Sequence, residues 1–301
     1  MSLLVTGSIG IDTVVSPHGR ADGVLGGSAV YFAFAASHYT RVRLVGAVGE
    51  DFPSEFRDVL ASRDIDLAGL EVRPSSKTFR WSGRYDGDMN DAKTVSVDLN
   101  VLAEDAPVVP PVFTDTETVF LANTHPTLQR ELLSQLDAPG IVVCDTMNLW
   151  IEQERESLVQ TLRCVTGVII NNAEARQLTG VVNLVEAGEA VLRLGPSFVV
   201  IKKGEHGALL VSVDGTAAIP AFPTKLVRDP TGAGDSFAGG FMGYLSVQDD
   251  RGFDALRRAM VRGTVAASFA IEDFSLDCVR DLPRADLDRR VDAFVNMLRV
   301  E

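Results

Sequence analysis

Short apolar runs alternate with helix-like segments along most of the chain. The runs are rich in β-branched residues, and the segments between them carry apolar positions at helical spacing. This alternation predicts a parallel sheet, and nearly continuous apolar runs predict strands that are buried on both faces. We therefore expect a doubly wound α/β fold, with strands over residues 3–9, 42–48, 118–122, 141–145, 167–171 and 198–202.

Two stretches break this rhythm. Residues 11–25 and 70–99 contain alternating polar and apolar positions, as in Thr94–Asp98, and neither stretch contains a helical segment. Together they predict a small second sheet over the carboxyl edge of the main sheet, where ligands bind in open α/β folds. We expect one domain, residues 1–301, with this small sheet as a lid.

Charge and composition exclude several classes of partner. The 41 acidic residues exceed the 28 Lys and Arg residues by 13, which disfavours binding to nucleic acid or to an anionic membrane. No apolar segment approaches the ~18 residues of a membrane span, and no basic stretch precedes the first apolar run. The three cysteines lie far apart and indicate neither a disulfide framework nor a metal cluster. These features predict a cytoplasmic protein.

Residues 229–237 carry the strongest chemical signal. We expect this segment to join a strand, which Pro230 ends, to a helix whose buried face begins at Phe237. Its glycines allow backbone angles that leave amides unpaired at the helix start, and such a terminus suits a phosphoryl group. Asp235 lies in the first turn, where an ionised carboxylate can accept a proton from an attacking hydroxyl. A glycine-rich turn capped by Asp235 is the alternative interpretation.

The segment does not fit the common nucleotide loops. No Lys follows the glycines, as a P-loop requires, and Phe237 stands where a dinucleotide loop needs its third glycine. Residues 229–235 instead resemble the C-terminal signature of the ribokinase-like, or PfkB, carbohydrate kinase family, with Pro230 in place of the usual Thr. The resemblance extends, in order, to Gly26-Gly27 with the Ala-rich helix that follows, and to residues 171–174 and 203–207.

This resemblance implies a Rossmann-like three-layer sandwich with a small β-sheet lid. It also implies transfer of the γ-phosphate of ATP, with Mg²⁺ present, to a hydroxyl of a sugar or sugar-like molecule. The general base is then Asp235, and the anion hole consists of the amides of Gly232, Ala233 and Gly234. Asp12, Gly26, Gly27 and Asn123 are the expected acceptor-binding residues, and Asn123 is placed there because it follows a strand.

The remaining implied residues face the nucleotide and its ions. The ATP side includes Lys202, Gly204, Gly207, Thr231, Gly263 and Thr264. Asn171 and Glu174 are expected to hold Mg²⁺ largely through water, and Asp229 is a candidate ligand for a monovalent cation such as K⁺. Simpler interpretations stay open: Glu174 as a solvated first-turn residue, Lys202 as a surface side chain, and Gly263 as a helix-packing position.

The acceptor is the main open question. A nucleoside is the nearest alternative to a sugar, because Tyr31 and the lid aromatics Phe79, Trp81 and Tyr85 could stack on a base. A vitamin kinase of the wider superfamily, or a non-catalytic ligand sensor with this fold, is a more distant alternative. The intact Gly-Ala-Gly-Asp segment argues against the sensor. The lid is also the expected surface for a homodimer.

Overall fold

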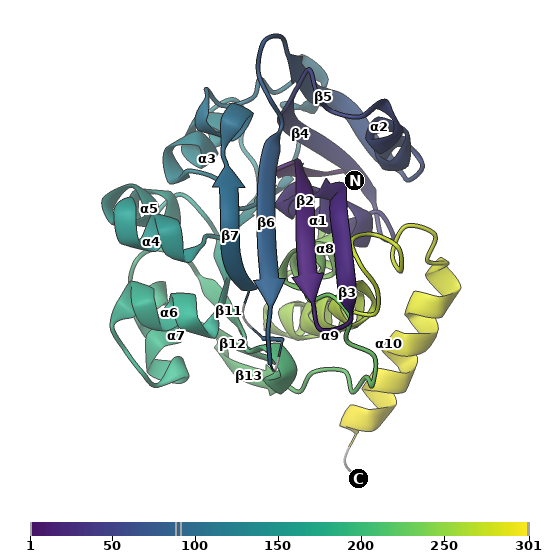
Figure 1. Ribbon diagram of the computed structural model, residues 1–301. Coiled ribbons are helices and arrows are strands. Elements are labelled where there is room, and N and C mark those ends of the chain that lie inside the picture. Colours follow the sequence, from purple (N-terminus) through teal and green to yellow (C-terminus); the bar gives the residue numbers. More distant parts are fainter. Residues whose placement is uncertain (1, 88, 91, 300–301) are drawn as a thin grey trace.

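Two β-sheets organise the molecule, and the smaller one lies across the larger (Figure 1). The structure is a computed structural model that describes residues 2–87, 89–90 and 92–299. The main sheet has nine strands in the order β13-β12-β11-β10-β9-β8-β1-β4-β5. Their bounds are β1 Ser2–Thr6, β4 Arg41–Gly49, β5 Ile65–Arg73, β8 Thr118–Leu121, β9 Ile141–Cys144, β10 Gly167–Asn171, β11 Phe198–Lys202, β12 Ala208–Ser212 and β13 Gly215–Ile219.

The main sheet is parallel from β5 across to β11, and β12 and β13 complete it in antiparallel pairing. All six predicted strands are present, but the first ends at Thr6 and not at residue 9. Successive residues of β1 face opposite cores, because Leu3 and Val5 join one apolar cluster and Leu4 joins the other. Burial on both faces explains the uninterrupted apolar runs in the sequence.

Helices cover both faces of the main sheet and complete three layers. One core includes residues of α1 (Ser28–Ala36), α2 (Ser54–Ala61), α8 (Ala233–Ser246), α9 (Phe253–Ala270) and α10 (Arg284–Leu298). The other core includes residues of α3 (Pro126–Leu133), α4 (Asn148–Gln153), α5 (Arg155–Leu162), α6 (Asn172–Thr179) and α7 (Leu184–Leu192). Short 3₁₀ turns are η1 (Asn100–Ala103), η2 (Pro111–Phe113) and η3 (Gly204–His206). The predicted α/β sandwich is thereby confirmed.

The small sheet, called the lid sheet below, has the order β3-β2-β6-β7. Its strands are β2 Gly10–Ser16, β3 Gly19–Gly26, β6 Phe79–Tyr85 and β7 Ala92–Asp98. The predicted boundary at residue 70 was too early, since residues 70–73 continue β5 and pair with β4. An edge strand that is covered on one face alternates much as a lid strand does, so the pattern alone could not separate them.

The expected strand before Asp229 is wrong. Residues 220–232, all of them described, form neither strand nor helix between β13 and α8. Pro220, Pro223 and Pro230 cannot donate backbone hydrogen bonds, so this stretch cannot sustain a ladder. The connection crosses from the sheet edge to α8 as an irregular loop.

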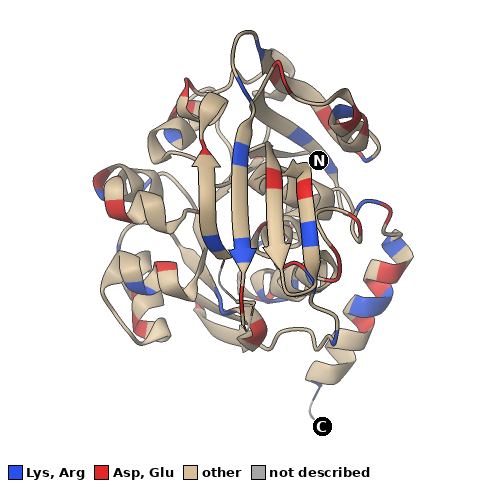
Figure 2. Cartoon of the chain, viewed as in Figure 1, with Lys and Arg blue, Asp and Glu red and all other residues tan. Residues whose placement is uncertain are grey.

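Charged side chains of both signs are interspersed over the elements drawn in Figure 2, including along α10. On α10, Arg284 pairs with Asp288. Lys and Arg do not gather into one stripe in this view. Among the described helices, none is long and apolar enough to cross a membrane.

Candidate active site

Asp235 lies in the first turn of α8, and the loop before it is built on a tight turn. The Ala233 amide donates to the Pro230 carbonyl over 3.1 Å, and Gly232 occupies the third position of this turn with φ 74° and ψ 0°. Glycine favours this left-handed conformation. Since the Ala233 amide is engaged, the amides of Gly232 and Gly234 are left for the anion hole, which stays a prediction.

Asp229 holds the beginning of this loop. Its carboxylate is fully buried and accepts hydrogen bonds from the Thr231 amide (2.9 Å) and the Ser275 amide (3.3 Å). Burial raises the pKa of Asp229, and these hydrogen bonds oppose the rise. Both carboxylate oxygens are therefore occupied by backbone amides. A monovalent cation near Asp229 stays a prediction.

Tyr31 supports the loop from the side of α1. A Cβ on Gly232 would lie 2.2 Å from the Tyr31 ring, so the ring rests directly on the turn. Tyr31 is 1% exposed, which leaves no ring face open for stacking on a base. The expectation that Tyr31 offers such a surface is therefore wrong for this conformation, because the close contact with Gly232 buries the ring.

Lys202 lies at the end of β11, close to the start of α8. A Cβ on Gly234 would lie 2.6 Å from its ammonium nitrogen. Burial raises the pKa of Asp235, and the positive charge of Lys202 lowers it. The same charge opposes the burial-driven rise in the pKa of Asp145 and of Glu174. One ammonium group thus lies among three carboxylates, which is not the surface position that a snorkelling lysine would have.

Asp145 follows β9 and is a site residue whose role the sequence did not specify. It is 5% exposed, and its Oδ1 atom has no hydrogen-bond partner among the described residues. Burial, and then the charge of Asp235, raise its pKa well above the usual range. The buried hydroxyls of Thr146 and Ser236 also lack partners within the described chain. Unsatisfied buried polar atoms at one sheet edge indicate a ligand site.

Asp12 lies on the backbone of the diglycine. A Cβ on Gly26 would lie 1.9 Å from Asp12 Oδ2, and a Cβ on Gly27 would lie 2.4 Å from the Ser8 carbonyl oxygen. Only glycine fits either position, and Gly27 also has φ 103° as the residue before α1. Burial raises the pKa of Asp12 to about 7, and the charges of Asp229 and Asp235 contribute to the rise.

Asn171 and Glu174 form a reciprocal cap at the start of α6. Asn171 Oδ1 accepts from the Glu174 amide (2.8 Å), and Glu174 Oε2 accepts from the Asn171 amide (2.7 Å). Glu174 is 7% exposed, so it is not the solvated first-turn residue of the simpler interpretation. The N-x-x-E motif therefore starts the helix as well as presenting oxygen atoms beside Lys202.

Asn123 is engaged within the protein. Its Oδ1 accepts from the Trp150 indole over 2.9 Å, and its amide nitrogen lies 3.1 Å from the Met147 sulfur. These contacts fix the turn after β8 against α4. Acceptor binding by Asn123 stays a prediction.

The predicted nucleotide residues lie in two regions. Gly204 (φ 54°) begins η3 and Gly207 (φ 81°) follows it, just beyond the end of β11. Gly263 lies where α9 crosses α8, because a Cβ there would lie 2.6 Å from the Phe237 carbonyl oxygen. Helix packing accounts for Gly263, and the neighbouring Thr264 is buried. Contact of these residues with ATP stays a prediction.

A separate cavity of about 640 Å³ lies at the opposite edge of the main sheet, at the amino ends of β1, β4 and β8. Its three arginines are engaged within the protein: Arg41 pairs with Asp66, Arg43 pairs with Asp115, and Arg251 donates to the Gln248 carbonyl. Ligands of open α/β sheets bind at the carboxyl ends of the strands. The candidate active site is therefore the edge that carries Asp235, Lys202 and Asp145.

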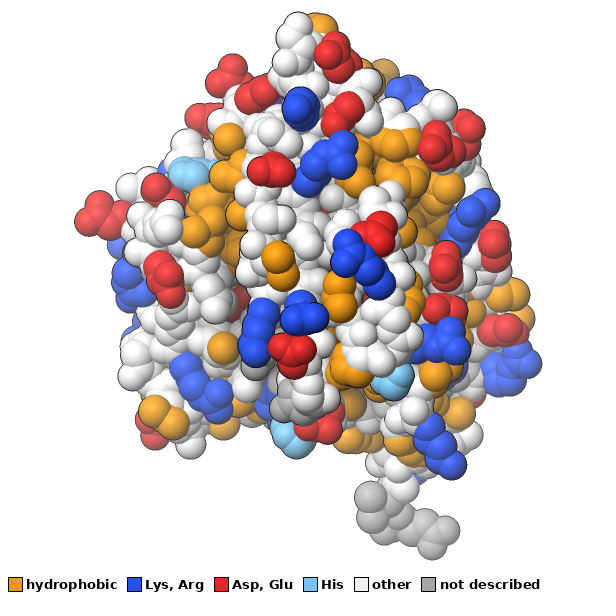
Figure 3. All heavy atoms as spheres, in the orientation of Figure 1, with side chains coloured by type: hydrophobic (Ala, Val, Ile, Leu, Met, Phe, Trp, Pro, Cys, Tyr) orange, Lys and Arg blue, Asp and Glu red, His pale blue; other side chains and the backbone are white. Residues whose placement is uncertain are grey.

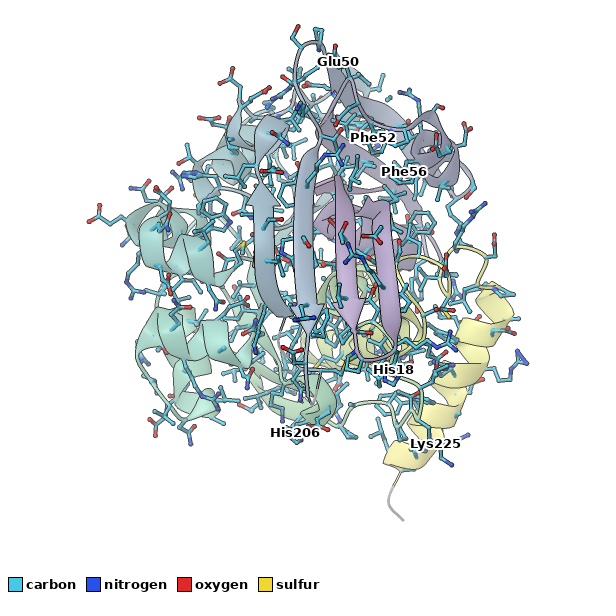
Figure 4. The ribbon with its side chains drawn as sticks, in the orientation of Figure 1. His18, Glu50, Phe52, Phe56, His206 and Lys225 are labelled. Atoms are coloured by element: carbon cyan, nitrogen blue, oxygen red, sulfur yellow. The ribbon has the colours of Figure 1, made fainter. Side chains whose placement is uncertain are left out.

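The histidines do not form a metal site. Figure 4 shows His18 and His206 apart from each other, His18 in the turn between β2 and β3 and His206 in η3. Within the described ranges, no group of three or more His, Cys, Asp or Glu side chains is arranged to hold a metal ion.

A family profile and two related proteins match most of this chain. The profile of the pfkB family carbohydrate kinases matches residues 22–278. A cytidine kinase from Thermococcus kodakarensis is 32% identical over 254 residues, covering 81% of this chain and 88% of that protein. A nucleoside kinase from Methanothermobacter thermautotrophicus is 28% identical over 255 residues, covering 82% of this chain and 78% of that protein.

The solved structures that resemble this fold include a Burkholderia thailandensis nucleoside kinase in complex with inosine. It superposes with a TM-score of 0.81 at 20% identity, covering 98% of this chain and 99% of that chain. Aminoimidazole riboside kinase from Salmonella enterica, complexed with aminoimidazole riboside and an ATP analog, also gives 0.81, at 18% identity and with 97% and 100% covered.

The chain is accordingly a phosphotransferase that acts on an alcohol group. It belongs to the pfkB family of carbohydrate kinases, within the sugar and nucleoside kinases of the ribokinase fold. Kinases of this family use ATP, and their acceptors are small molecules. The family resemblance of residues 229–235 is confirmed.

Proposed function

We propose that this enzyme transfers the γ-phosphate of ATP to a hydroxyl of a nucleoside. The relatives named cytidine kinase and nucleoside kinase support a nucleoside over a free sugar. The observation that carries the proposal is Asp235 in the first turn of α8 with the Lys202 ammonium beside it. Phe79 and Trp81 are partly exposed on the lid sheet and are the available lid aromatics for contact with a base.

Each group in the proposed mechanism has one task. Asp235 accepts the proton of the attacking hydroxyl, which forms the bond to phosphorus as the bond to the leaving ADP oxygen breaks. The amides of Gly232 and Gly234, at the positive end of the α8 dipole, stabilise the charge on the transferring group. Lys202 supplies a positive charge on the same side.

Asp12 orients the acceptor in this proposal. A buried carboxylate can accept hydrogen bonds from two neighbouring hydroxyls, and the bare backbone at Gly26 and Gly27 lets a polyol approach closely. The Oδ1 atom of Asp12 has no partner among the residues described, so it is available to a ligand. This arrangement suits a sugar ring, whether free or part of a nucleoside.

The carboxylates near Lys202 fit a magnesium ion. Asp145 Oδ1 has no partner in the described chain, and one Glu174 oxygen is engaged in the α6 cap. Mg²⁺ typically keeps several waters and binds one or two carboxylates together with substrate phosphates. Asp145, Glu174 and Asn171 would hold it in this way, where it would neutralise phosphate charge. We also assign Asp229 and Thr231 to the vicinity of a monovalent cation, K⁺ being the candidate.

A homodimer through the lid sheet is also part of the proposal. β7 is the edge strand of that sheet and is exposed along its length, with Val95 at 68% and Val97 at 47%. Exposed apolar side chains on a free strand edge favour pairing with a second chain. Sedimentation of the purified protein with and without Val95→Lys tests this surface, and a monomer in both cases would refute it.

A cytoplasmic location is supported by the cysteines. Cys144, Cys164 and Cys278 are all unpaired, and Cys164 is exposed. An exposed thiol persists in a reducing compartment.

An acceptor panel tests the proposed function. Purified enzyme with Mg-ATP is offered cytidine, inosine, adenosine, ribose and fructose, and the phosphorylated product is separated by chromatography. We expect turnover of at least one nucleoside with a kcat/KM at least about tenfold above either sugar, since discrimination by a few polar contacts reaches this size. Asp235→Asn is the matched control. Preference for a free sugar would refute the acceptor class.

A further inference from the structure

Three lid strands contact the loop that precedes α8 and the turn beside it. From β2, Ser16 Oγ donates to the Arg228 carbonyl over 2.7 Å. From β6, the Tyr85 hydroxyl accepts from the Thr231 hydroxyl over 3.3 Å. From β3, the Leu25 carbonyl accepts from Ser275 Oγ over 2.7 Å. The lid sheet is thus bonded to the loop as well as placed across the main sheet (Figure 1).

The Tyr85 contact is made by a buried aromatic side chain. It is 7% exposed and packs in a small apolar cluster with Val14 and Met89, against Val227 and Phe274. Its hydroxyl therefore meets Thr231 away from competing water, where a hydrogen bond specifies position strongly. A buried ring in this cluster has no face for stacking on a base, which corrects the expectation for Tyr85.

The hydrogen bond between Tyr85 and Thr231 also restrains the start of α8, because Thr231 lies just before it. Its amide donates to Asp229, and the next residue is Gly232, whose backbone rests on the Tyr31 ring. The turn is consequently clamped between α1 on one side and the lid sheet on the other. A shift of the Thr231 side chain would move the Gly232 and Gly234 amides, and such donors act over a narrow distance range.

We propose that Tyr85 is a positioning residue. Through its hydrogen bond to Thr231, the lid sheet keeps the amides of Gly232 and Gly234 in the position that phosphoryl transfer requires. This inference rests on the function proposed for Gly232 and Gly234. Tyr85 contacts no reacting atom in it. The lid thus acts on the chemical step as well as covering the acceptor.

The kinetic test removes one hydroxyl. Tyr85→Phe keeps the ring and should lower kcat about three- to tenfold, the range of one net hydrogen bond. KM for ATP and for the acceptor should change less than about twofold, because the amides act mainly on the transition state. Thr231→Val should match this loss, and the double variant should be no slower than the poorer single variant. Thr231→Ser, which keeps the hydroxyl, should lose less kcat than Thr231→Val.

Tyr244→Phe is the matched control, since it removes a hydroxyl that bonds to Arg258 at the other end of α8. It should leave kcat unchanged. Additive losses in the double variant, or an equal loss in the control, would overturn the inference. So would an unchanged kcat in Tyr85→Phe.

A second readout does not depend on catalysis. Hydrogen exchange of residues 228–234 should be faster in Tyr85→Phe and in Thr231→Val than in wild type, and unchanged in Tyr244→Phe. Unchanged exchange in all variants would refute the coupling even if Asp235→Asn abolishes activity. Faster exchange with a fully active Asp235→Asn would instead refute the proposed catalysis and leave the coupling in place.

Discussion

Replacing Asp12 by Asn should remove a large pH dependence from the stability of this enzyme. Burial raises the Asp12 pKa from 3.8 to about 7. Between these values the folded protein holds a proton that the unfolded chain has released, so the free energy of unfolding falls as the pH rises. The contribution of Asp12 to the free energy of unfolding is complete when the pH lies below the Asp12 pKa of the unfolded chain. It is lost once the pH passes about 7, the pKa in the folded protein.

The size of the effect follows from the two pKa values. Proton linkage gives a contribution of about 2.7 kcal/mol at pH 5 and close to zero at pH 8. Wild type should therefore lose about 2.6 kcal/mol more than Asp12→Asn between these pH values. Comparing the two proteins at two pH values cancels any fixed cost of placing an amide beside Gly26 and Gly27.

Equilibrium unfolding in urea at pH 5 and pH 8 measures all four free energies. Asp58→Asn, on exposed helix α2, controls for the loss of one negative charge. A wild-type pH slope equal to that of Asp12→Asn would mean that Asp12 is ionised in the folded protein at both pH values. The acceptor site would then hold a permanent charge, and the reasoning from burial would be wrong.

Four further outcomes are expected at the phosphoryl-transfer site. Asp235→Asn should lower kcat by roughly 10² to 10⁴ in steady-state assays while ATP binding persists, and a kcat within about threefold of wild type would exclude Asp235 as the base. Lys202→Met removes a charge that lowers the Asp235 pKa, so the acidic limb of the kcat–pH profile should move to higher pH. An unmoved limb would contradict that coupling. Chelation of Mg²⁺ should abolish turnover, and K⁺ in place of Na⁺ should raise it several-fold; equal rates in the two salts would remove the cation site near Asp229.

The sequence predicted the main sheet because its strands are buried on both faces, and such burial leaves a direct local pattern. Asp235 was also predicted correctly at a helix start, since glycines and a following apolar face mark that position locally. The Asn171–Glu174 cap was missed although its signal was available. An Asn followed three residues later by Glu, just before a helix, is itself a capping-box pattern.

Other features had no local signal. The contact of Tyr31 with Gly232 joins residues that are far apart in the chain, and it depends on how α1 packs against α8. Lys202 approaches the carboxylates because β9, β10 and β11 are neighbours in the sheet, and strand order cannot be read from periodicity. The grouping of hydrophobic side chains on the surface has no local signal either. Hydrophobic side chains gather between the lid sheet and α2 in Figure 3, where Figure 4 places Phe52 and Phe56.

The parallel pairing of β2 with β6 affects how this enzyme can be rebuilt. β2 and β3 follow β1 in the chain, whereas β6 and β7 follow β5. The lid sheet is therefore formed by two separate segments of the chain, which meet where β2 pairs with β6. Neither segment contains a complete sheet, and an isolated two-stranded hairpin is only marginally stable in water. An engineer who wishes to exchange acceptor specificity with a relative must therefore transplant residues 10–26 and 79–98 together. Exchanging one of them alone would pair β2 of one protein with β6 of the other, across the seam that joins the two segments.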